Sequence, residues 1–213
     1  MLHGILGVAM NQIMLSVQPK WAEKILNGTK TIEIRKSVPK ELPCEVYLYV
    51  TKAEPYLNVH KGTPFEDGEL YTSYFLQNCP LNFEEHTSKH LSATNLNGRV
   101  VAKFTLNKAN TLEHCQWVNQ QVETYTPRGI ISNFEILDKA CLNIVELCAY
   151  GKGKPLYAWH IDDLVIFDRP MELGEFRNIG KAKIMGKQLN HVWKSLTRAP
   201  QSWCRVCATP KGE

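Results

Sequence analysis

The apolar positions along the chain change their spacing several times, and each change predicts an element. Short runs rich in β-branched and aromatic residues predict strands. These runs are 14–17, 31–34, 45–51, 99–106, 156–161, 164–167 and 202–207. Apolar residues recur at helical spacing after Pro19, through Lys20–Leu26, which predicts a helix. Asn27-Gly28 should end this helix, because glycine adopts the left-handed cap conformation at little cost.

The remaining segments are predicted from weaker patterns. A second helix is expected over 137–149, and a short helical turn is expected from Pro170 to Phe176. The polar stretch 107–128 is expected to be irregular and to lead into a mobile loop at 126–129. Residues 52–97 are interpreted as an insertion, with a short helix near 70–76 as one option.

The order of these elements sets the fold class. Strands and helices do not alternate as βαβ units, which favours a mixed barrel over a doubly wound sheet. We therefore predict an α+β fold, a mixed and mostly antiparallel β-barrel with flanking helices. One domain is expected over residues 10–209, and residues 1–9 are expected to be a disordered extension.

Composition agrees with a folded domain. Of 213 residues, 44% are hydrophobic and 22% are charged, close to the globular average of roughly 45–50% and about 25%. The net charge of +4 tolerates a polyanionic partner without requiring one. Seven cysteines and no secretory signal predict a cytoplasmic protein with free thiols. The apolar start is too short to span a bilayer, which needs about 20 residues, so no membrane partner is expected.

Residues 28–35, Gly-Thr-Lys-Thr-Ile-Glu-Ile-Arg, carry the strongest functional signal. Residues two apart on a strand share a face, so Thr31, Glu33 and Arg35 should point the same way. Lys30, at the turn, can reach the same place. Arginine can bind phosphate through two parallel N–H donors, and lysine supplies a point charge. Glutamate can accept a hydrogen bond from an exocyclic amine. The alternative is an exposed strand face with a Glu–Arg pair worth less than about 1 kcal/mol.

The pattern Gly-x-Lys-x-x-Glu-x-Arg resembles the signature of the ASCH superfamily, whose barrel resembles the PUA domain. The segments 19–27, 157–164 and 199–204 also look similar to that family. The resemblance implies a PUA-like barrel with a cleft between the helix-to-strand turn and the barrel. It implies RNA, a nucleotide or a modified nucleoside as the ligand, bound beside Lys30, Thr31, Glu33 and Arg35.

Two other functions stay open. Some small ASCH-like bacterial proteins are amidohydrolases that remove the acetyl group from N4-acetylcytidine with a Lys and a Thr of this segment. Lys30 matches the Lys, but Glu33 stands where those enzymes have the Thr. In a hydrolase, Lys30 would act as base or nucleophile and Glu33 would shuttle a proton. The third function is a protein-interaction or regulatory module.

Three more residues are candidates for the ligand site. Trp159 could stack on a base, although a core tryptophan is the alternative. His160 could donate a hydrogen bond in the cleft or be structural, and Gln201 could read a base edge by analogy with the family. The basic stretch from Lys181 to Arg198 would form a cationic stripe if it were helical, and a solvated face is its alternative.

The sequence predicts neither a metal nor a cofactor. Cys204 and Cys207 lie three apart on a predicted strand, so their thiols should point to opposite faces. No second cysteine pair has matching spacing, and a structural zinc site needs four ligands. No P-loop or glycine-rich dinucleotide motif occurs in the chain.

Overall fold

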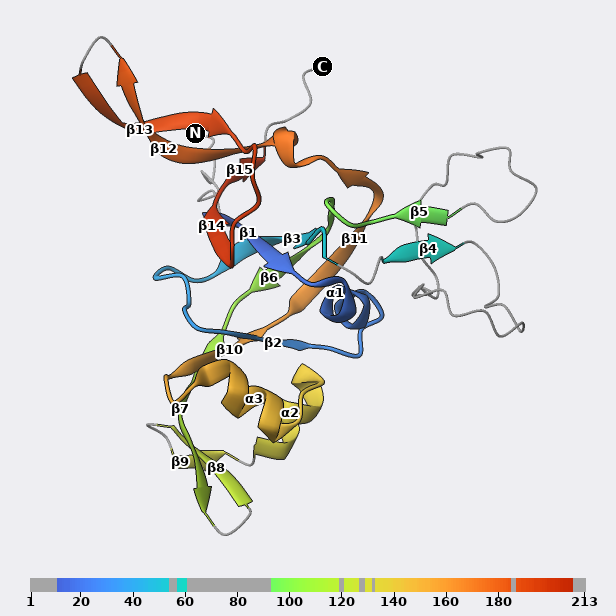
Figure 1. The fold of residues 1–213 in the computed structure, drawn as a ribbon, viewed down its shortest axis with the longest axis vertical. Coiled ribbons are helices and arrows are strands. Elements are labelled where there is room, and N and C mark those ends of the chain that lie inside the picture. The colour runs from blue at the N-terminus through green and yellow to red at the C-terminus, as the bar shows by residue number, and fades with distance from the viewer. Residues whose placement is uncertain are drawn as a thin grey trace, which may run out of the picture.

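The computed structural model describes residues 11–53, 57–60, 93–118, 121–126, 129–131, 133–184 and 187–208 (Figure 1). Its helices are α1 (Pro19–Leu26), α2 (Asn133–Ala140) and α3 (Ile144–Gly151), with a 3-10 turn at Leu173–Glu175. Its strands are β1 (Asn11–Val17), β2 (Ile32–Arg35), β3 (Cys44–Val50), β4 (Asn58–His60), β5 (Ala93–Asn95), β6 (Val100–Leu106), β7 (Ala109–Val118), β8 (Gln121–Thr126), β9 (Gly129–Ile131), β10 (Leu156–His160), β11 (Asp162–Met171), β12 (Phe176–Ile184), β13 (Lys187–Ser195), β14 (Trp203–Arg205) and β15 (Cys207–Ala208).

The fold is mixed α+β with few helices and mostly antiparallel strand pairs, as predicted. One five-stranded sheet has the order β11-β6-β3-β1-β14, with β3 at its centre. Its β1 and β3 are parallel, and the other neighbours are antiparallel. The second five-stranded sheet has the order β2-β10-β7-β8-β9. The pairings among the described strands do not join these two sheets into a closed ring.

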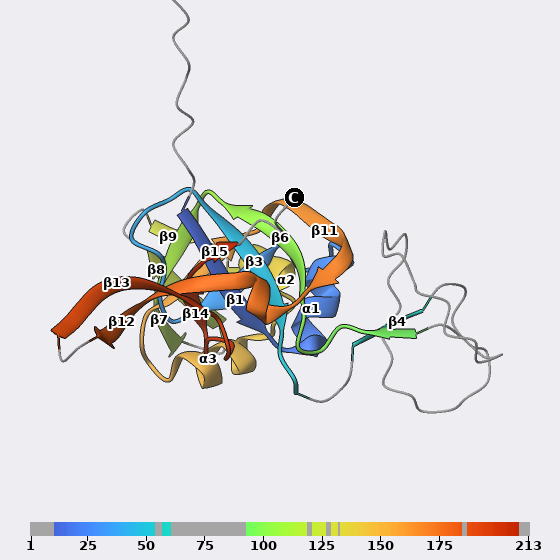
Figure 2. The ribbon, with the colours of Figure 1, turned by 90° about the horizontal axis from the view of Figure 1, so that it is seen from above.

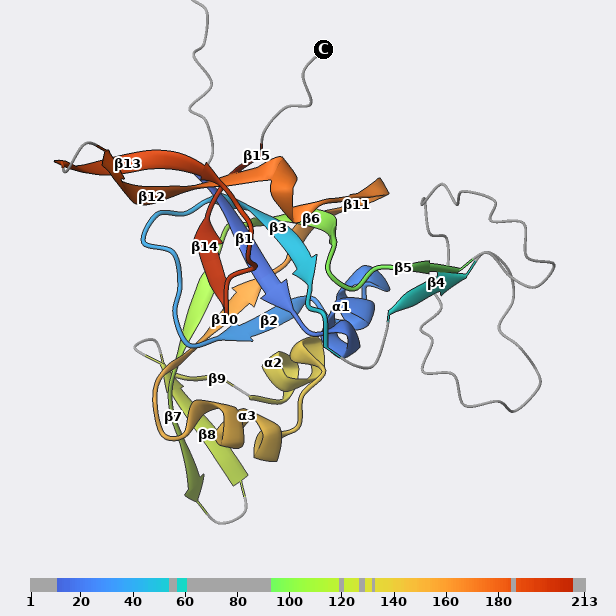
Figure 3. The ribbon, with the colours of Figure 1, turned by 45° about the horizontal axis from the view of Figure 1, so that its top comes forward.

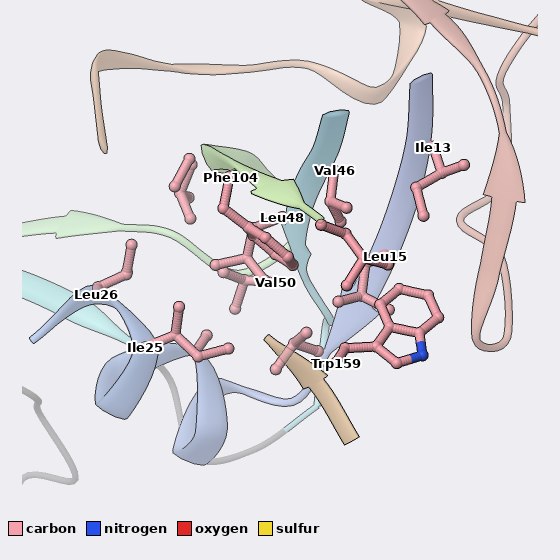
Figure 4. Packing of buried hydrophobic residues seen from close by; sticks show 14 of the residues in the cluster. Ile13, Leu15, Ile25, Leu26, Val46, Leu48, Val50, Phe104 and Trp159 are labelled. Carbon is pink, nitrogen blue, oxygen red and sulfur yellow. The ribbon is translucent and has the colours of Figure 1, made fainter. Parts of the chain in front are cut away.

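The main core lies between the two large sheets and α1. Three residues of α1, Ala22, Ile25 and Leu26, pack with the apolar face of β1, β3 and β6. Trp159 of β10 joins the same core from the second sheet (Figure 4). Alternation explains this arrangement, because Ile13, Leu15 and Val17 are two apart on β1 and therefore share one face.

A second core fixes the position of α2 and α3. Ile32 and Ile34 of β2 and Ala158 of β10 belong to this core, and α2 and α3 lie on one side of β2 and β10 (Figure 3). Ala140 of α2 and Leu147 of α3 are buried against them. As a result, β2 is buried on both faces, between the main core and this helical layer.

The helix predicted over 137–149 is wrong in one respect, because the chain folds it as two helices. Cys141 has φ +51°, a left-handed conformation that a continuous α-helix does not allow. Asn143 then begins α3 as an N-cap. Its side chain accepts from the Glu146 amide, while the Glu146 carboxylate accepts from the Asn143 amide.

Three other predictions need correction. The stretch 107–128 is mostly strand, in β7 and β8, and the expected loop at 126–129 falls partly outside the described residues, with Thr126 in β8 and Gly129 in β9. Antiparallel strands with one solvated face tolerate such polar sequences. The basic stretch 181–198 is not helical, because β12 and β13 pair as an antiparallel β-hairpin, and the closing strand is two short strands, β14 and β15.

Some predictions fall partly or wholly outside the described residues. Of the proposed insertion at 52–97, the structure describes 52–53, 57–60 and 93–97, which include the antiparallel pair β4 and β5. The optional helix near 70–76 and the extension 1–9 lie outside, so the limits of the single domain stay a prediction. Within the described ranges, no helix combines the length and the hydropathy that crossing a membrane requires.

Candidate functional site

The turn between α1 and β2 positions Lys30. Gly28 has φ +75°, the left-handed conformation predicted for the helix end, and its amide donates to the Ile25 carbonyl. The Lys30 amide then donates to the Lys24 carbonyl. These contacts hold the chain beside the end of α1 and direct Lys30 inward, where it is 2% exposed.

Pairing with β10 fixes the direction of Glu33 and Arg35. Glu33 lies opposite Trp159, and Arg35 lies opposite Tyr157. Directly opposed residues of an antiparallel pair share a face, so Glu33 and Arg35 point together, away from α2 and α3. The shared face predicted for Glu33 and Arg35 is confirmed, whereas Thr31 lies before the first residue of β2 and does not join them.

The three charged residues of the motif meet in one buried group, which we call the charge cluster: Lys30, Glu33 and Arg35. Glu33 Oε2 lies 3.3 Å from Lys30 Nζ, and Glu33 Oε1 lies 3.0 Å from Arg35 Nη2. Glu33 is 6% exposed and Arg35 is 8% exposed. The alternative of an exposed surface pair is therefore wrong.

Backbone carbonyls complete much of the hydrogen bonding of the cluster. Lys30 Nζ donates to the Ala140 carbonyl at 2.5 Å, and Arg35 Nη2 donates to the Ser16 carbonyl at 2.8 Å. One donor is left over, because Arg35 Nε is buried and has no hydrogen-bond partner among the described residues. Two cations share one carboxylate, so the cluster carries one excess positive charge.

Two aromatic residues that the sequence analysis did not assign to the site border the cluster. Lys30 Nζ lies 5.1 Å from the centre of the Trp21 ring on α1. Tyr150 on α3 is partly exposed, and Lys36 Nζ lies 4.7 Å from its ring centre. Burial raises the pKa of the Tyr150 hydroxyl, while the charge of Arg35 lowers it and that of Glu33 raises it. Trp21 sits in the apolar pattern of the helix predicted after Pro19, and Tyr150 follows the end of the helix predicted over 137–149, so the sequence analysis did not consider either for the site.

An ion pair connects the two helices that carry these aromatic residues. Lys20 Nζ on α1 lies 3.7 Å from Glu146 Oε1 on α3, and both side chains are well exposed. Exposed pairs of this kind contribute about 0–1 kcal/mol. This ion pair therefore contributes little to holding α1 and α3 together at this edge.

Trp159 belongs to the core and not to a binding surface. It is 0% exposed, and its indole Nε1 donates to the Ser37 carbonyl at 3.2 Å. Its ring meets the edge of the Trp203 ring at 6.1 Å between centres. The enclosed ring offers no face to a base, which corrects its assignment as a stacking residue.

The other predicted site residues lie in different places. Thr31 is exposed, and its amide donates to the Lys139 carbonyl of α2. Gln201 is exposed beside Pro200, whose carbonyl accepts from Ser16 Oγ at 2.6 Å. Because the Ser16 carbonyl also accepts from Arg35, the Gln201 segment reaches the edge of the charge cluster.

His160 lies apart from the charge cluster. His160 lies on β10, opposite Ile32 of β2, and its side chain is on the face turned away from Glu33. Its Nε2 lies 2.7 Å from Asn110 Oδ1. Burial lowers the pKa of His160 from 6.5, and the charge of Lys108 lowers it further. The structure therefore does not bring His160 together with Lys30, Glu33 and Arg35.

The lowered pKa of His160 predicts a pH dependence. The unfolded chain binds this proton more tightly than the folded chain, so stability should fall as pH drops below about 6.5. We expect His160→Gln to remove this part of the loss. Urea midpoints of both proteins at about pH 7.5 and about pH 5 measure it. A parallel loss in the two proteins would show that His160 does not contribute.

Metal ligands do not gather in the part of the chain that the structure describes. No group of three or more His, Cys, Asp or Glu side chains is close enough there to hold an ion. Cys204 lies in β14 and Cys207 lies in β15.

These features define a class of protein. It is a mixed α+β domain with a buried Lys–Glu–Arg cluster at a helix-to-strand turn. A family model for the ASCH domain matches residues 15–131, more than half of the chain. The chain belongs to the ASCH domain family, a family of PUA-like domains.

Crystal structures of an ASCH protein, including the following two, are similar to this chain. One is "ASCH from Zymomonas mobilis", with a TM-score of 0.43 and 16% identity, covering 76% of this chain and 74% of that one. The other is a point mutant of the Zymomonas mobilis protein, with a TM-score of 0.42 and 14% identity, covering 76% of each chain. None of the curated proteins matches the chain.

Proposed function

We propose that this ASCH domain binds RNA by holding one nucleotide at the charge cluster, with a phosphate oxygen accepting from Arg35. The observation that carries the proposal is the unpartnered Nε of Arg35 inside a buried cluster with one excess positive charge. The association of the ASCH family with nucleic-acid binding supports it.

The physical argument rests on the cost of an unsatisfied buried donor. Leaving such a group unpaired costs about 1–3 kcal/mol, and more when the group is charged. An anionic oxygen would pair with Arg35 Nε and neutralise the excess charge in one step. Guanidinium groups suit phosphate because their N–H donors form a planar fork.

The surroundings of the cluster suit a nucleotide better than a bare anion. Trp21 and Tyr150 present partly exposed aromatic rings beside it. A base stacked on such a ring gains about 1–3 kcal/mol. The ligand would enter between α1 and α3, where the exposed Lys20–Glu146 pair opens easily.

The fold-level part of the proposal is that the two large sheets form the predicted PUA-like barrel. The main core supports it, because α1, β1, β3 and β6 contribute to that core together with Trp159 of the second sheet. Closure of these sheets into a barrel would require tilted strands and a matching register at the edges that meet.

The amidohydrolase alternative is less well supported. A lysine base or nucleophile must release its proton before it can act. Lys30 donates to the Ala140 carbonyl and is paired with Glu33. Turnover of N4-acetylcytidine by the purified protein, lost in Lys30→Ala, would favour the hydrolase instead.

Substitution of Arg35 tests the proposal. We expect Arg35→Gln to weaken binding of nucleoside monophosphates about tenfold to a hundredfold, since a charge-assisted hydrogen bond contributes about 1.5–3 kcal/mol. Arg35→Lys keeps the charge but lacks the planar set of N–H donors. Its affinity should therefore lie between those of the original protein and Arg35→Gln. Isothermal titration calorimetry measures the affinities.

A matched control separates this site from general charge. Arg205 is exposed and pairs with Glu41 at 3.5 Å, so Arg205→Gln removes the same charge elsewhere. We expect Arg205→Gln to bind like the original protein. Circular dichroism must show that the Arg35 variants are folded. Equal affinities of folded Arg35→Gln and Arg205→Gln would rule out the proposed phosphate contact.

A further inference from the structure

The hairpin of β12 and β13, which we call the basic ribbon, projects from the rest of the domain. The two strands pair from Arg177 opposite Ser195 to Ile184 opposite Lys187. β15 pairs with β12 only at Phe176 and Arg177. Figure 2 shows the ribbon extending away from the body of the fold beyond this base.

Charge is distributed unevenly along the chain, and the ribbon lies in its basic part. Residues 176–213 contain eight Lys and Arg and one acidic residue, Glu213, which gives +7. Since the whole chain carries +4, residues 1–175 carry −3. The ribbon itself has no acidic residue, and its cations are Arg177, Lys181, Lys183, Lys187 and Lys194.

The ribbon also carries an exposed tryptophan. Trp193 on β13 is 49% exposed, opposite Ile179 and next to exposed Lys194. By contrast, Trp159 is enclosed, and Trp21 and Trp203 pack against the main core. A large aromatic ring in water is an unused contact surface, and base stacking is one use for it in a basic environment.

We propose that the basic ribbon binds single-stranded RNA, with its cations along the phosphates and Trp193 stacked on a base. Cations and an aromatic ring together are the means by which proteins bind single strands. A duplex would use the cations alone, because its bases are already stacked, so the exposed ring favours a single strand. Each ribbon strand has nine residues, about 30 Å, which is long enough to follow several nucleotides.

This proposal extends the proposed function. The charge cluster would take one nucleotide, and the ribbon would hold the strand around it. The ribbon lies outside residues 15–131, the part of the chain that the family model matches. Because the two surfaces use different residues, each can fail without the other.

The test uses the full chain and a fluorescein-labelled oligouridine of about ten nucleotides, followed by anisotropy at several salt concentrations. Lys181→Gln, Lys183→Gln and Lys187→Gln combined should weaken binding at least about tenfold at low salt. The slope of log K against log salt should shrink by about two, since each phosphate contact on a single strand contributes about 0.7. Trp193→Ala should weaken binding about fivefold to a hundredfold and leave the slope unchanged.

Two controls make the result specific. Lys40→Gln, Lys52→Gln and Lys154→Gln combined remove three exposed charges outside the ribbon, and this variant should bind the oligouridine normally. The ribbon variants should also keep their affinity for nucleoside monophosphates, which reports on the charge cluster. If both ribbon variants bound the oligouridine as tightly as the original protein, the proposal would be overturned. Tighter binding of a DNA or RNA duplex than of the single strand would overturn it too.

Discussion

Glu33→Gln is expected to lower the free energy of unfolding by about 3–5 kcal/mol, the usual result of removing one partner from a buried ion pair. Glu33 is the carboxylate that Lys30 and Arg35 share, and all three residues are buried. Glutamine keeps the shape but leaves two cations without a counter-charge. Urea unfolding followed by tryptophan fluorescence measures the change.

A matched variant shows that burial and not pairing causes the effect. Glu135 and Lys139 on α2 are closer, at 2.6 Å, yet both are exposed. Glu135→Gln should leave the urea midpoint almost unchanged. Adding Lys30→Met to Glu33→Gln should recover part of the loss, because one uncompensated cation remains instead of two. A loss in Glu33→Gln no greater than in Glu135→Gln would mean that water solvates the cluster.

Trp159→Ala is expected to cost about 3–5 kcal/mol, the range for truncating a buried aromatic residue. The substitution leaves a cavity in the main core and removes the hydrogen bond to the Ser37 carbonyl. Trp193→Ala is the matched control, because it removes the same side chain from an exposed position. Surface substitutions stay within about 0.5 kcal/mol.

The same pair of variants distinguishes the two interpretations of Trp159. If Trp159 were a stacking residue on the surface, its removal would reduce ligand binding and leave the urea midpoint in place. We expect the reverse, a large loss of stability. Equal midpoints for Trp159→Ala and Trp193→Ala would contradict the enclosed position of Trp159.

Local signals predicted the shape of the motif, and they could not predict its burial. The left-handed glycine at position 28 and the shared face of Glu33 and Arg35 follow from rules that span a few residues. Burial depends on distant segments. Ala140 supplies the carbonyl for Lys30, and Ser16 supplies the one for Arg35. Nothing near residues 28–35 indicates these partners.

In the basic ribbon, the sequence contains both a helical and a strand spacing of apolar residues, and the secondary structure predicted depends on which spacing is followed. The residues Leu189, Val192 and Trp193 fit a helical spacing, which is why a helix was considered for 181–198. However, Lys181 to Ile184 alternate strictly between lysine and an apolar residue, which is the period of a strand. That signal covers four residues, and pairing between β12 and β13 makes it the correct one.

The position of β14 has a consequence for the order in which the fold can be completed during synthesis. β1 pairs on one side with β3, which follows it closely, and on the other side with β14. The Ala208 amide donates to Gln12 Oε1 across 196 residues of sequence. On the ribosome, the first strand described here must therefore keep one edge open until β14, at residues 203–205, has emerged. Open strand edges recruit other strands, so translation speed and chaperone access at this stage should govern the yield of native protein.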